Sequence, residues 1–163
     1  MRKRLLFLLV LLVTLSGCGK KEIQDNKVTT GQVENENVIV CTSNQSSTQY
    51  ELNSTYTIYH DGRYVDYVHS VTYLFSSNSK LLDSMYESER EAYKKMDEKY
   101  GGYDYDVSRM NNKVVSDAKI NYSDMNIQKL ISDDPSLSKY VRNGKMLVDG
   151  IKDFYMTKGA TCE

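Results

Sequence analysis

Few residues in this chain of 163 are of a type that does chemistry. They are three cysteines, two histidines and a group of aspartates. A zinc site needs cysteine or histidine ligands that converge with a defined spacing, and neither His60 nor His69 has a cysteine near it in the sequence. The chain also lacks G-x-S-x-G, P-loop and H-E-x-x-H motifs. We therefore expect no metal, no cofactor and no catalytic residues.

The aspartates are candidates for a carboxylate site. Asp104 and Asp106 alternate with tyrosines in YDYDVS, so both would point to one face of a strand. Asp117 would join them from the strand that follows. Calcium takes about 6–8 oxygen ligands, and the sequence has no D-x-D-x-D-G loop. We interpret these carboxylates as a solvated face; the alternative is an envelope enzyme or enzyme accessory that uses Asp104 and Asp106.

Cys18 follows a segment that has the pattern of an export signal. Residues 2–4 are basic and residues 5–15 are apolar. The apolar run is too short to span a bilayer, which takes about 20 residues. Its length is that of the apolar region of a secretory signal peptide, about 7–15 residues. The chain is therefore predicted to leave the cytosol.

The residues before Cys18 resemble the lipobox of bacterial lipoproteins. Leu15-Ser16-Gly17-Cys18 is a branched apolar residue, two small residues and a cysteine, directly after the apolar run. The resemblance implies a signal peptide over residues 1–17 and a diacylglycerol, with acyl chains such as palmitate, on the Cys18 thiol. A plain secretory signal with an incidental cysteine is the alternative. We expect a lipid anchor in the cell membrane, on the extracytoplasmic side.

The other two cysteines, Cys41 and Cys162, form an even remainder. In an exported chain such a pair can form a stable disulfide. Cys41 lies in the predicted first strand, VIVCTS, and Cys162 follows the glycine that ends the last predicted helix. We expect a Cys41–Cys162 bond that closes a loop over nearly the whole domain. Two free thiols are the alternative.

The composition indicates one globular domain behind a polar tether. Hydrophobic residues make up 40% of the chain and charged residues 26%, with a net charge of -1, so nothing favours nucleic acid as a partner. Residues 18–37 are polar without periodicity, and as a random coil they would reach on the order of 25 Å. We expect residues 18–37 to be the lipidated cysteine and its flexible tether. A single domain should cover residues 38–163.

A first hairpin is predicted around Asp61-Gly62, a dipeptide that favours a two-residue type I′ turn. Residues equidistant from that turn would face each other, with the apolar members inward and His69 among them, opposite Ser54. Tyr59 and Tyr64 would face each other on the outer side. The expected inward pairs are Ile58–Val65, Tyr56–Tyr67, Leu52–Val71 and Tyr50–Tyr73, and the expected outer residues include Asp66, Ser70 and Thr72.

The rest of the chain alternates helices with a second hairpin. A helix capped by Asn78 or Ser79 should end at Gly101-Gly102. A hairpin with Asn111-Asn112 at its turn should put Asp104, Asp106, Asp117 and Lys119 on one face. A short helix near residues 127–131 and a last helix over residues 146–158 follow. The predicted fold is α+β: an open antiparallel sheet of two hairpins plus an N-terminal strand, with helices packed on one face.

The order of these segments resembles the YehR-like bacterial lipoproteins, a family with a domain of unknown function. The resemblance consists of the lipobox, the YTIYHDGRYVDYV hairpin, the helix before YGGYDYDVS, INYSDM and the closing KGATCE. It implies no catalytic residues. We expect a non-enzymatic module at the cell envelope that binds an envelope protein or a small ligand. Its candidate ligand face consists of Tyr59, Tyr64, Asp66, Asp104 and Asp106.

Overall fold

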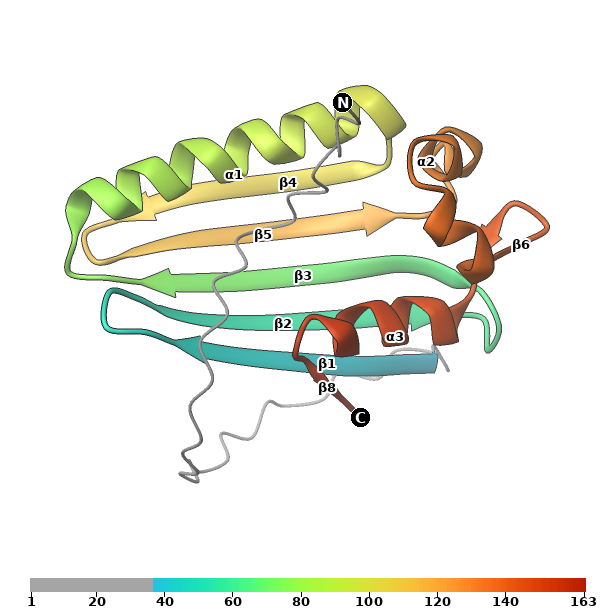
Figure 1. Ribbon diagram of the computed structural model, residues 1–163, viewed down its shortest axis with the longest axis horizontal. Helices are drawn as coiled ribbons and strands as arrows, with labels where there is room; N and C mark the ends of the chain where they lie inside the picture. Colours follow the sequence, from blue (N-terminus) through green and yellow to red (C-terminus); the bar gives the residue numbers. More distant parts are fainter. Residues whose placement is uncertain (1–36) are drawn as a thin grey trace, which may run out of the picture. The chain divides into compact units, whose positions relative to one another are not determined.

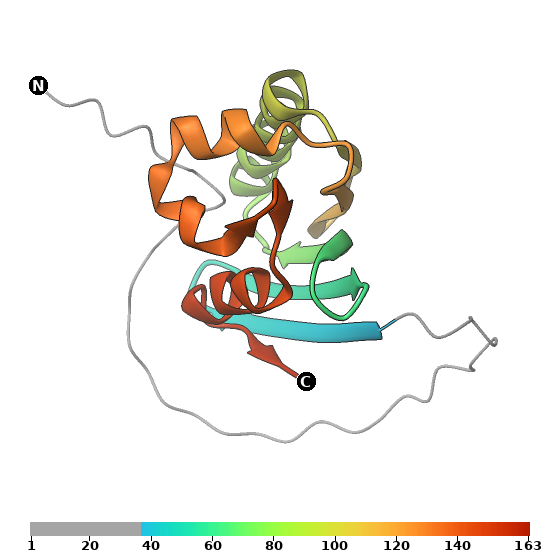
Figure 2. The ribbon, with the colours of Figure 1, turned by 90° about the vertical axis from the view of Figure 1, so that its right-hand side faces the viewer.

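The computed structural model describes residues 37–163, which form the predicted α+β fold. One antiparallel sheet of six strands has helices against one face (Figures 1 and 2). No helix of residues 37–163 lies against the other face, the open face. The predicted signal peptide, the lipid-attachment residue Cys18 and the tether lie outside the described residues, except that Asn37 begins the first strand.

Eight strands and four helices make up the described domain. The strands of the large sheet are β1 (Asn37–Ser46), β2 (Glu51–His60), β3 (Val65–Phe75), β4 (Tyr103–Met110), β5 (Lys113–Asn121) and β8 (Thr161–Cys162), in the spatial order β4-β5-β3-β2-β1-β8. The remaining elements are α1 (Ser79–Tyr100), α2 (Ile127–Asp133), the 3₁₀ helix η1 (Pro135–Tyr140), the two-stranded ribbon β6 (Val141–Arg142) and β7 (Lys145–Met146), and α3 (Val148–Thr157). Figure 1 shows α1 along β4 and α3 over β1 and β2, with β3 between them.

The first hairpin forms, but its predicted turn is wrong. Asp61 and Tyr64 close a wider loop, in which the Asp61 N–H donates to the Tyr64 carbonyl at 3.1 Å. Asp61 Oδ1 accepts from the N–H groups of Arg63 and Tyr64 at 2.8 and 2.6 Å. These two backbone donors lower the pKa of Asp61. The aspartate side chain thus stabilises a longer loop than the Asp-Gly pair predicts.

The wider loop moves the register of β3. Ile58 lies opposite Val68 instead of Val65, and a bulge separates Tyr59 from His60. The displacement is an odd number of residues, so it exchanges the two faces of β3. The expected pairs Tyr56–Tyr67, Leu52–Val71 and Tyr50–Tyr73 are therefore also wrong: the structure pairs Tyr56 with Ser70, Leu52 with Leu74 and Tyr59 with Tyr67.

The second hairpin confirms its predicted register. Tyr103 lies opposite Ile120, Tyr105 opposite Ala118, and Val107 opposite Ser116, around a turn at residues 111–112. β5 then pairs with β3, so the two hairpins form one sheet. The largest fully buried side chains lie on the helix-covered side of that sheet: Ile58, Leu82, Val68 and Cys41.

Helix α1 has the predicted ends. The Asn78 side chain accepts a hydrogen bond from the Leu81 N–H at 3.2 Å, which caps the first turn. At the other end, the Gly101 N–H donates to the Asp97 carbonyl at 2.8 Å. Gly102 has a φ of +82°, and a Cβ there would lie 2.5 Å from the Asn121 carbonyl oxygen. Only glycine fits at this junction of α1 with the second hairpin.

The last helix is shorter than predicted, because Met146 belongs to β7 and α3 begins at Val148. Backbone bonds hold this start: the Leu147 N–H donates to the Tyr140 carbonyl and the Val148 N–H to the Arg63 carbonyl. The helix ends before Gly159, as expected. The chain then forms β8, a short strand that the sequence did not predict.

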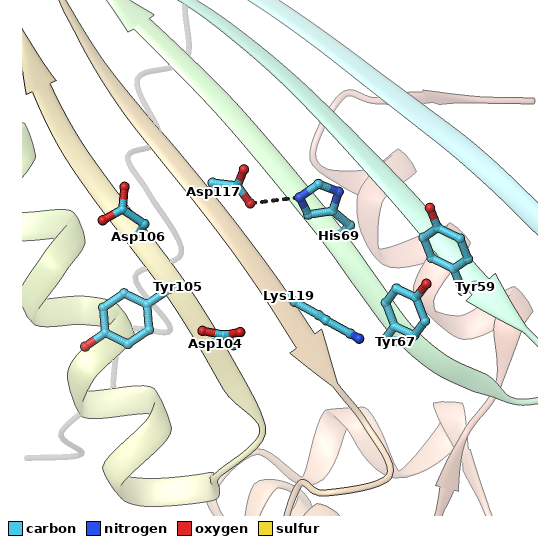
Figure 3. A pocket seen from close by; sticks show the side chains of 8 residues that line it. All are labelled: Tyr59, Tyr67, His69, Asp104, Tyr105, Asp106, Asp117 and Lys119. Carbon is cyan, nitrogen blue, oxygen red and sulfur yellow. Dashed lines mark hydrogen bonds and ion pairs between the residues drawn. The ribbon is translucent and has the colours of Figure 1, made fainter. Parts of the chain in front are cut away.

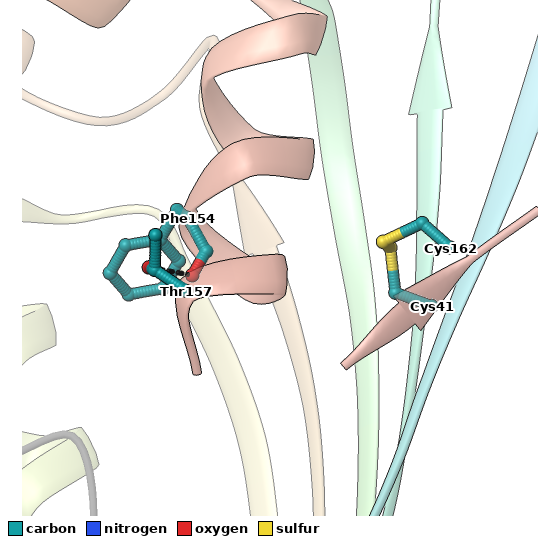
Figure 4. The surroundings of a disulfide bond; sticks show 4 residues. All are labelled: Cys41, Phe154, Thr157 and Cys162. Carbon is teal, nitrogen blue, oxygen red and sulfur yellow. Dashed lines mark hydrogen bonds between the residues drawn. A yellow bond between two sulfur atoms is a disulfide. The ribbon is translucent and has the colours of Figure 1, made fainter. Parts of the chain in front are cut away.

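Strand β8 lies against β1 and carries the predicted disulfide (Figure 4). Cys41 and Cys162 are directly opposite each other, with Cα atoms 4.0 Å apart and a bond between their sulfur atoms. Two hydrogen bonds between Val40 and Glu163 flank the pair, at 3.0 and 2.9 Å. The disulfide therefore fastens the last described strand to the first.

Candidate functional site

The open face has a depression of about 470 Å³ (Figure 3). It lies near the start of β3, close to the loop that joins β2 to β3. Its residues come from four strands that are neighbours in the sheet, β4, β5, β3 and β2. The lining mixes aromatic, acidic and basic side chains. They are Tyr59, Tyr67, His69, Asp104, Asp106, Asp117 and Lys119, together with Tyr105 of the edge strand, whose ring stacks on Tyr93 of α1.

The strand register brings these side chains together. Asp104 is opposite Lys119, and Asp106 is opposite Asp117, across the pair β4–β5. His69 is opposite Lys119 across the pair β5–β3. Alternate residues of a strand share a face, so each of these strands contributes charged or polar groups to the same surface. Like charges directly opposite each other are unfavourable, which applies to Asp106 and Asp117.

A tyrosine stack forms the aromatic side of the depression. The rings of Tyr59 and Tyr67 have centroids 4.2 Å apart and planes 16° apart. The Lys119 Nζ lies 4.1 Å from the centroid of the Tyr67 ring, a cation–π distance. Figure 3 shows Tyr67 between Lys119 and Tyr59, with Tyr59 at the outer end of the series.

A histidine–aspartate pair connects β3 to β5, the inner strand of the second hairpin. His69 Nε2 is 2.8 Å from Asp117 Oδ1. The two side chains are 42% and 55% exposed, so both are accessible to a ligand. The contact offsets part of the repulsion between Asp117 and Asp106, and it fixes the orientation of the imidazole.

These groups are suited to binding. Carboxylates accept hydrogen bonds, Lys119 donates them, and imidazole can do either. Serine, threonine and cysteine are absent from the lining, so it supplies no hydroxyl or thiol nucleophile of those types. Among residues 37–163, no cluster of His, Cys, Asp and Glu side chains has the arrangement of a metal site.

Only three of the five residues of the predicted ligand face line the depression. Tyr59, Asp104 and Asp106 line the depression. Tyr64 does not: it forms an isolated bridge with Leu147, and its hydroxyl accepts from Asn143 Nδ2 at 3.4 Å. Asp66 is exposed outside the lining, and its carbonyl accepts from the Tyr122 N–H. The expected contact between Tyr59 and Tyr64 is wrong because the loop is wider than a two-residue turn.

Two lining residues were missed for the same reason. Tyr67 and His69 were expected on the covered face, His69 as a core histidine opposite Ser54, yet both line the depression. Ser70 and Thr72, expected outside, have exchanged faces with them, and Ser70 is buried. The signal that would have placed them is the second hairpin: the charged face of β5 needs a polar partner on β3, which His69 provides and Val68 does not.

Comparison with known proteins found similarity to a solved structure but to no family model and no curated protein. No protein-family model and no curated protein matches the chain. An NMR structure of a protein from Streptococcus pneumoniae TIGR4 is similar with a TM-score of 0.46, at 12% identity, over 92% of this chain and 99% of that chain. Within residues 37–163, no helix is long and apolar enough to cross a bilayer.

Proposed function

We propose that this chain is a bacterial lipoprotein of the YehR-like type, and that it binds a ligand through its open face without catalysing a reaction. The observation that carries the proposal is the depression, where an aromatic stack lies beside exposed carboxylates and an exposed histidine. The lipobox at Cys18 supports the anchored location. The polar segment after Cys18 would let the domain reach a ligand near the membrane surface.

The chemistry of the depression fits a hydroxyl-rich ligand such as an envelope glycan. A sugar ring has an apolar C–H face that packs on an aromatic ring, and Tyr59 is at the outer end of the tyrosine stack. Hydroxyl groups donate to carboxylates, which Asp104 and Asp106 supply from the edge strand. Lys119 and His69 add donors on the neighbouring strands.

The glycan proposal is tested by titrating the full chain with oligosaccharide fragments of bacterial cell wall, followed by NMR or calorimetry. We expect Tyr59→Ala and Asp104→Asn each to weaken binding by about tenfold, the equivalent of about 1.4 kcal/mol. Tyr73→Ala is the matched control, because Tyr73 is an exposed tyrosine of β3 outside the depression. Equal binding by all the variants, or none by the parent chain, would overturn the proposal.

The anchor is tested separately. Metabolic labelling with a radioactive lipid precursor should label the parent protein and leave Cys18→Ser unlabelled and unprocessed. Two or more acyl chains hold a protein stably on a bilayer, so the parent should fractionate with membranes. A Cys18→Ser protein that still carries label would refute the assignment of the lipid to this residue.

The second candidate is an envelope enzyme or enzyme accessory that uses the sheet-face carboxylates Asp104 and Asp106. The observation in its favour is the contact of His69 with Asp117, which orients an imidazole as general bases are oriented. Release of reducing sugar ends from the same fragments would reveal this activity. Turnover by the parent chain that His69→Gln abolishes would replace the binding proposal with the enzymatic one.

A further inference from the structure

Three exposed cations gather around one tyrosine at the end of the sheet where β2 joins β3. The Arg63 guanidinium carbon lies 5.4 Å from the centroid of the Tyr64 ring, and the Lys145 ammonium nitrogen lies 5.5 Å from it. Arg142 is opposite Lys145 across the β6–β7 ribbon. All three cationic residues are exposed to solvent. Arg63, Arg142 and Lys145 together form the basic cluster.

Contacts between the β2–β3 loop and the β6–β7 ribbon hold the basic cluster together. Tyr64 forms an isolated bridge with Leu147, and the Val148 N–H donates to the Arg63 carbonyl at 3.1 Å. Asn143, at the turn of the ribbon, donates to the Tyr64 hydroxyl at 3.4 Å. The loop and the ribbon therefore present their cations side by side at one end of the sheet (Figure 1).

The basic cluster has more positive charge than its surroundings neutralise. None of the ion pairs among residues 37–163 includes a member of the cluster. Arg142 and Lys145 are like charges directly opposite each other, which is unfavourable without an anion. Asp61 is the one carboxylate of the loop and the ribbon. It interacts with Lys145, but its Oδ1 already accepts from two backbone N–H groups.

The chain that leads back to the predicted anchor leaves the domain beside the basic cluster. Asn37 is the first described residue and lies opposite His60, where the β2–β3 loop begins. A Cβ on Gly62 of that loop would lie 3.8 Å from Asn37 Nδ2. Residues 19–36 separate Asn37 from Cys18. A lipid on Cys18 would therefore keep this end of the domain, on average, nearer to the bilayer than the opposite end.

We propose that the basic cluster binds the anionic phosphate headgroups of the membrane that holds the lipid anchor. The inference rests on the anchor in the proposed function and adds a second, electrostatic contact to it. Each Lys or Arg near an anionic bilayer strengthens attachment about fivefold. Tyr64 suits the same interface because a tyrosine has an apolar ring and a polar hydroxyl. Lys20 and Lys21, which follow Cys18 in the sequence, add charge of the same sign.

The test uses NMR of the mature lipidated chain in nanodiscs that contain a paramagnetic headgroup label. On phosphatidylglycerol, the signals of Tyr64 and Gly144 should broaden more than that of Asn112, which lies in the turn at the opposite end of the sheet. On phosphatidylcholine they should not. Salt at about 1 M, where the Debye length is about 3 Å, should abolish the difference. Arg63→Gln and Lys145→Gln should each lower the ratio of bound to free domain about fivefold.

The matched controls are Lys80→Gln and Lys113→Gln. Each removes one positive charge from the end of the sheet where α1 begins and β4 joins β5, opposite the basic cluster (Figure 1). Neither substitution should change the broadening at Tyr64 and Gly144. All four substitutions are at surface cations, and urea unfolding of each variant verifies that it is folded.

Three results would overturn the proposal: equal broadening at both ends of the sheet, equal broadening on both lipids, or the same loss in the control variants. A response of Tyr64 and Gly144 to dissolved glycerol phosphate, without a preference for the anionic bilayer, would also overturn it. Failure of the anchor is distinguishable from these results. A chain without lipid would not fractionate with membranes, yet its Tyr64 and Gly144 signals should still respond to added phosphatidylglycerol nanodiscs.

Discussion

Carboxylates occupy two contrasting environments on the two faces of the sheet. On the open face, Asp104 and Asp106 are exposed to water, and Asp117 is held by His69. On the covered face, the Glu89 carboxylate is withdrawn from water and has only the Ser116 hydroxyl as a partner. An ionised carboxylate is stabilised by water, by donors or by a cation. The open-face carboxylates are therefore stabilised by water and by His69, whereas Glu89 makes the stability of the domain depend on pH.

The ionisation of Glu89 should lower the free energy of unfolding as the pH rises. Its pKa is 4.5 as a free group and about 7 in the fold, so the folded state binds the proton more tightly. The contribution of protonated Glu89 to the free energy of unfolding is fully present below pH 4.5. It is lost as the pH rises through about 7. At about 1.4 kcal/mol per pKa unit, the loss is at most about 3.5 kcal/mol, and partial exposure reduces it.

This prediction is checked by urea unfolding at about pH 5 and about pH 8. Glu89→Gln should remove most of the decline in the free energy of unfolding between the two conditions. Glu91→Gln should not, because Lys95 lowers the pKa of Glu91 and the effect there has the opposite sign. An unchanged decline in Glu89→Gln would contradict the assignment.

The sequence could identify only part of the site at this scale. Asp104 and Asp106 were predictable because strict alternation with tyrosines reveals their face. His69 was not, because the strand around it has an apolar residue on each face, Val68 on one and Val71 on the other, and so fits both registers. Glu89 was hidden in a charged run of α1, where only its packing against Ser116 distinguishes it from Glu87 and Glu91.

At the scale of elements, the turn between two strands sets their register where the hydrophobic pattern of the strands fits more than one. Helix α1 was predictable at both ends because Asn78 and Gly101 carry local capping signals. The Asp61-Gly62 pair is also a local signal, but the Asp61 side chain can instead bind the next backbone N–H groups, and it does so. The start of α3 depends on backbone contacts with Arg63 and Tyr140, which are distant in sequence.

Gly102→Ala should destabilise the domain more than Gly144→Ala. Both glycines have a positive φ, +82° and +74°, which costs a non-glycine residue about 1–2 kcal/mol. An alanine at position 102 would also meet the Asn121 carbonyl at 2.5 Å, whereas position 144 has nothing within 4 Å. The extra loss should be on the order of 1–3 kcal/mol. Equal melting temperatures for the two variants would contradict this prediction. They would show that the backbone at the α1–β4 junction can shift to accept a Cβ at little cost.

At the scale of the whole molecule, the sheet order joins distant parts of the chain. β4 and β8 form its two edges, and the first and last described strands are neighbours. The two hairpins were predictable because their pairings are local. The contact between β3 and β5, which sets the strand order, spans the whole of α1. No local pattern specifies that contact, so the sequence predicted a sheet without its strand order.

The disulfide should be the largest single contribution to stability. It joins residues 121 positions apart, and by chain entropy a loop of that length stabilises by about 5 kcal/mol. The double variant Cys41→Ser with Cys162→Ser should lower the free energy of unfolding by up to that amount. Cys18→Ser is the control, since it leaves the bond intact. Two free thiols in the mass of the non-reduced parent protein would contradict this prediction.

The Cys41–Cys162 bond also determines how the domain responds to mechanical load. If the domain is pulled between its first and last described strands, the tension passes from β1 to β8 through the covalent bond and bypasses the rest of the sheet. The chain between the two cysteines is therefore shielded from extension. In single-molecule pulling, the oxidised domain should lengthen very little. After reduction, the 121-residue span should extend by on the order of 400 Å.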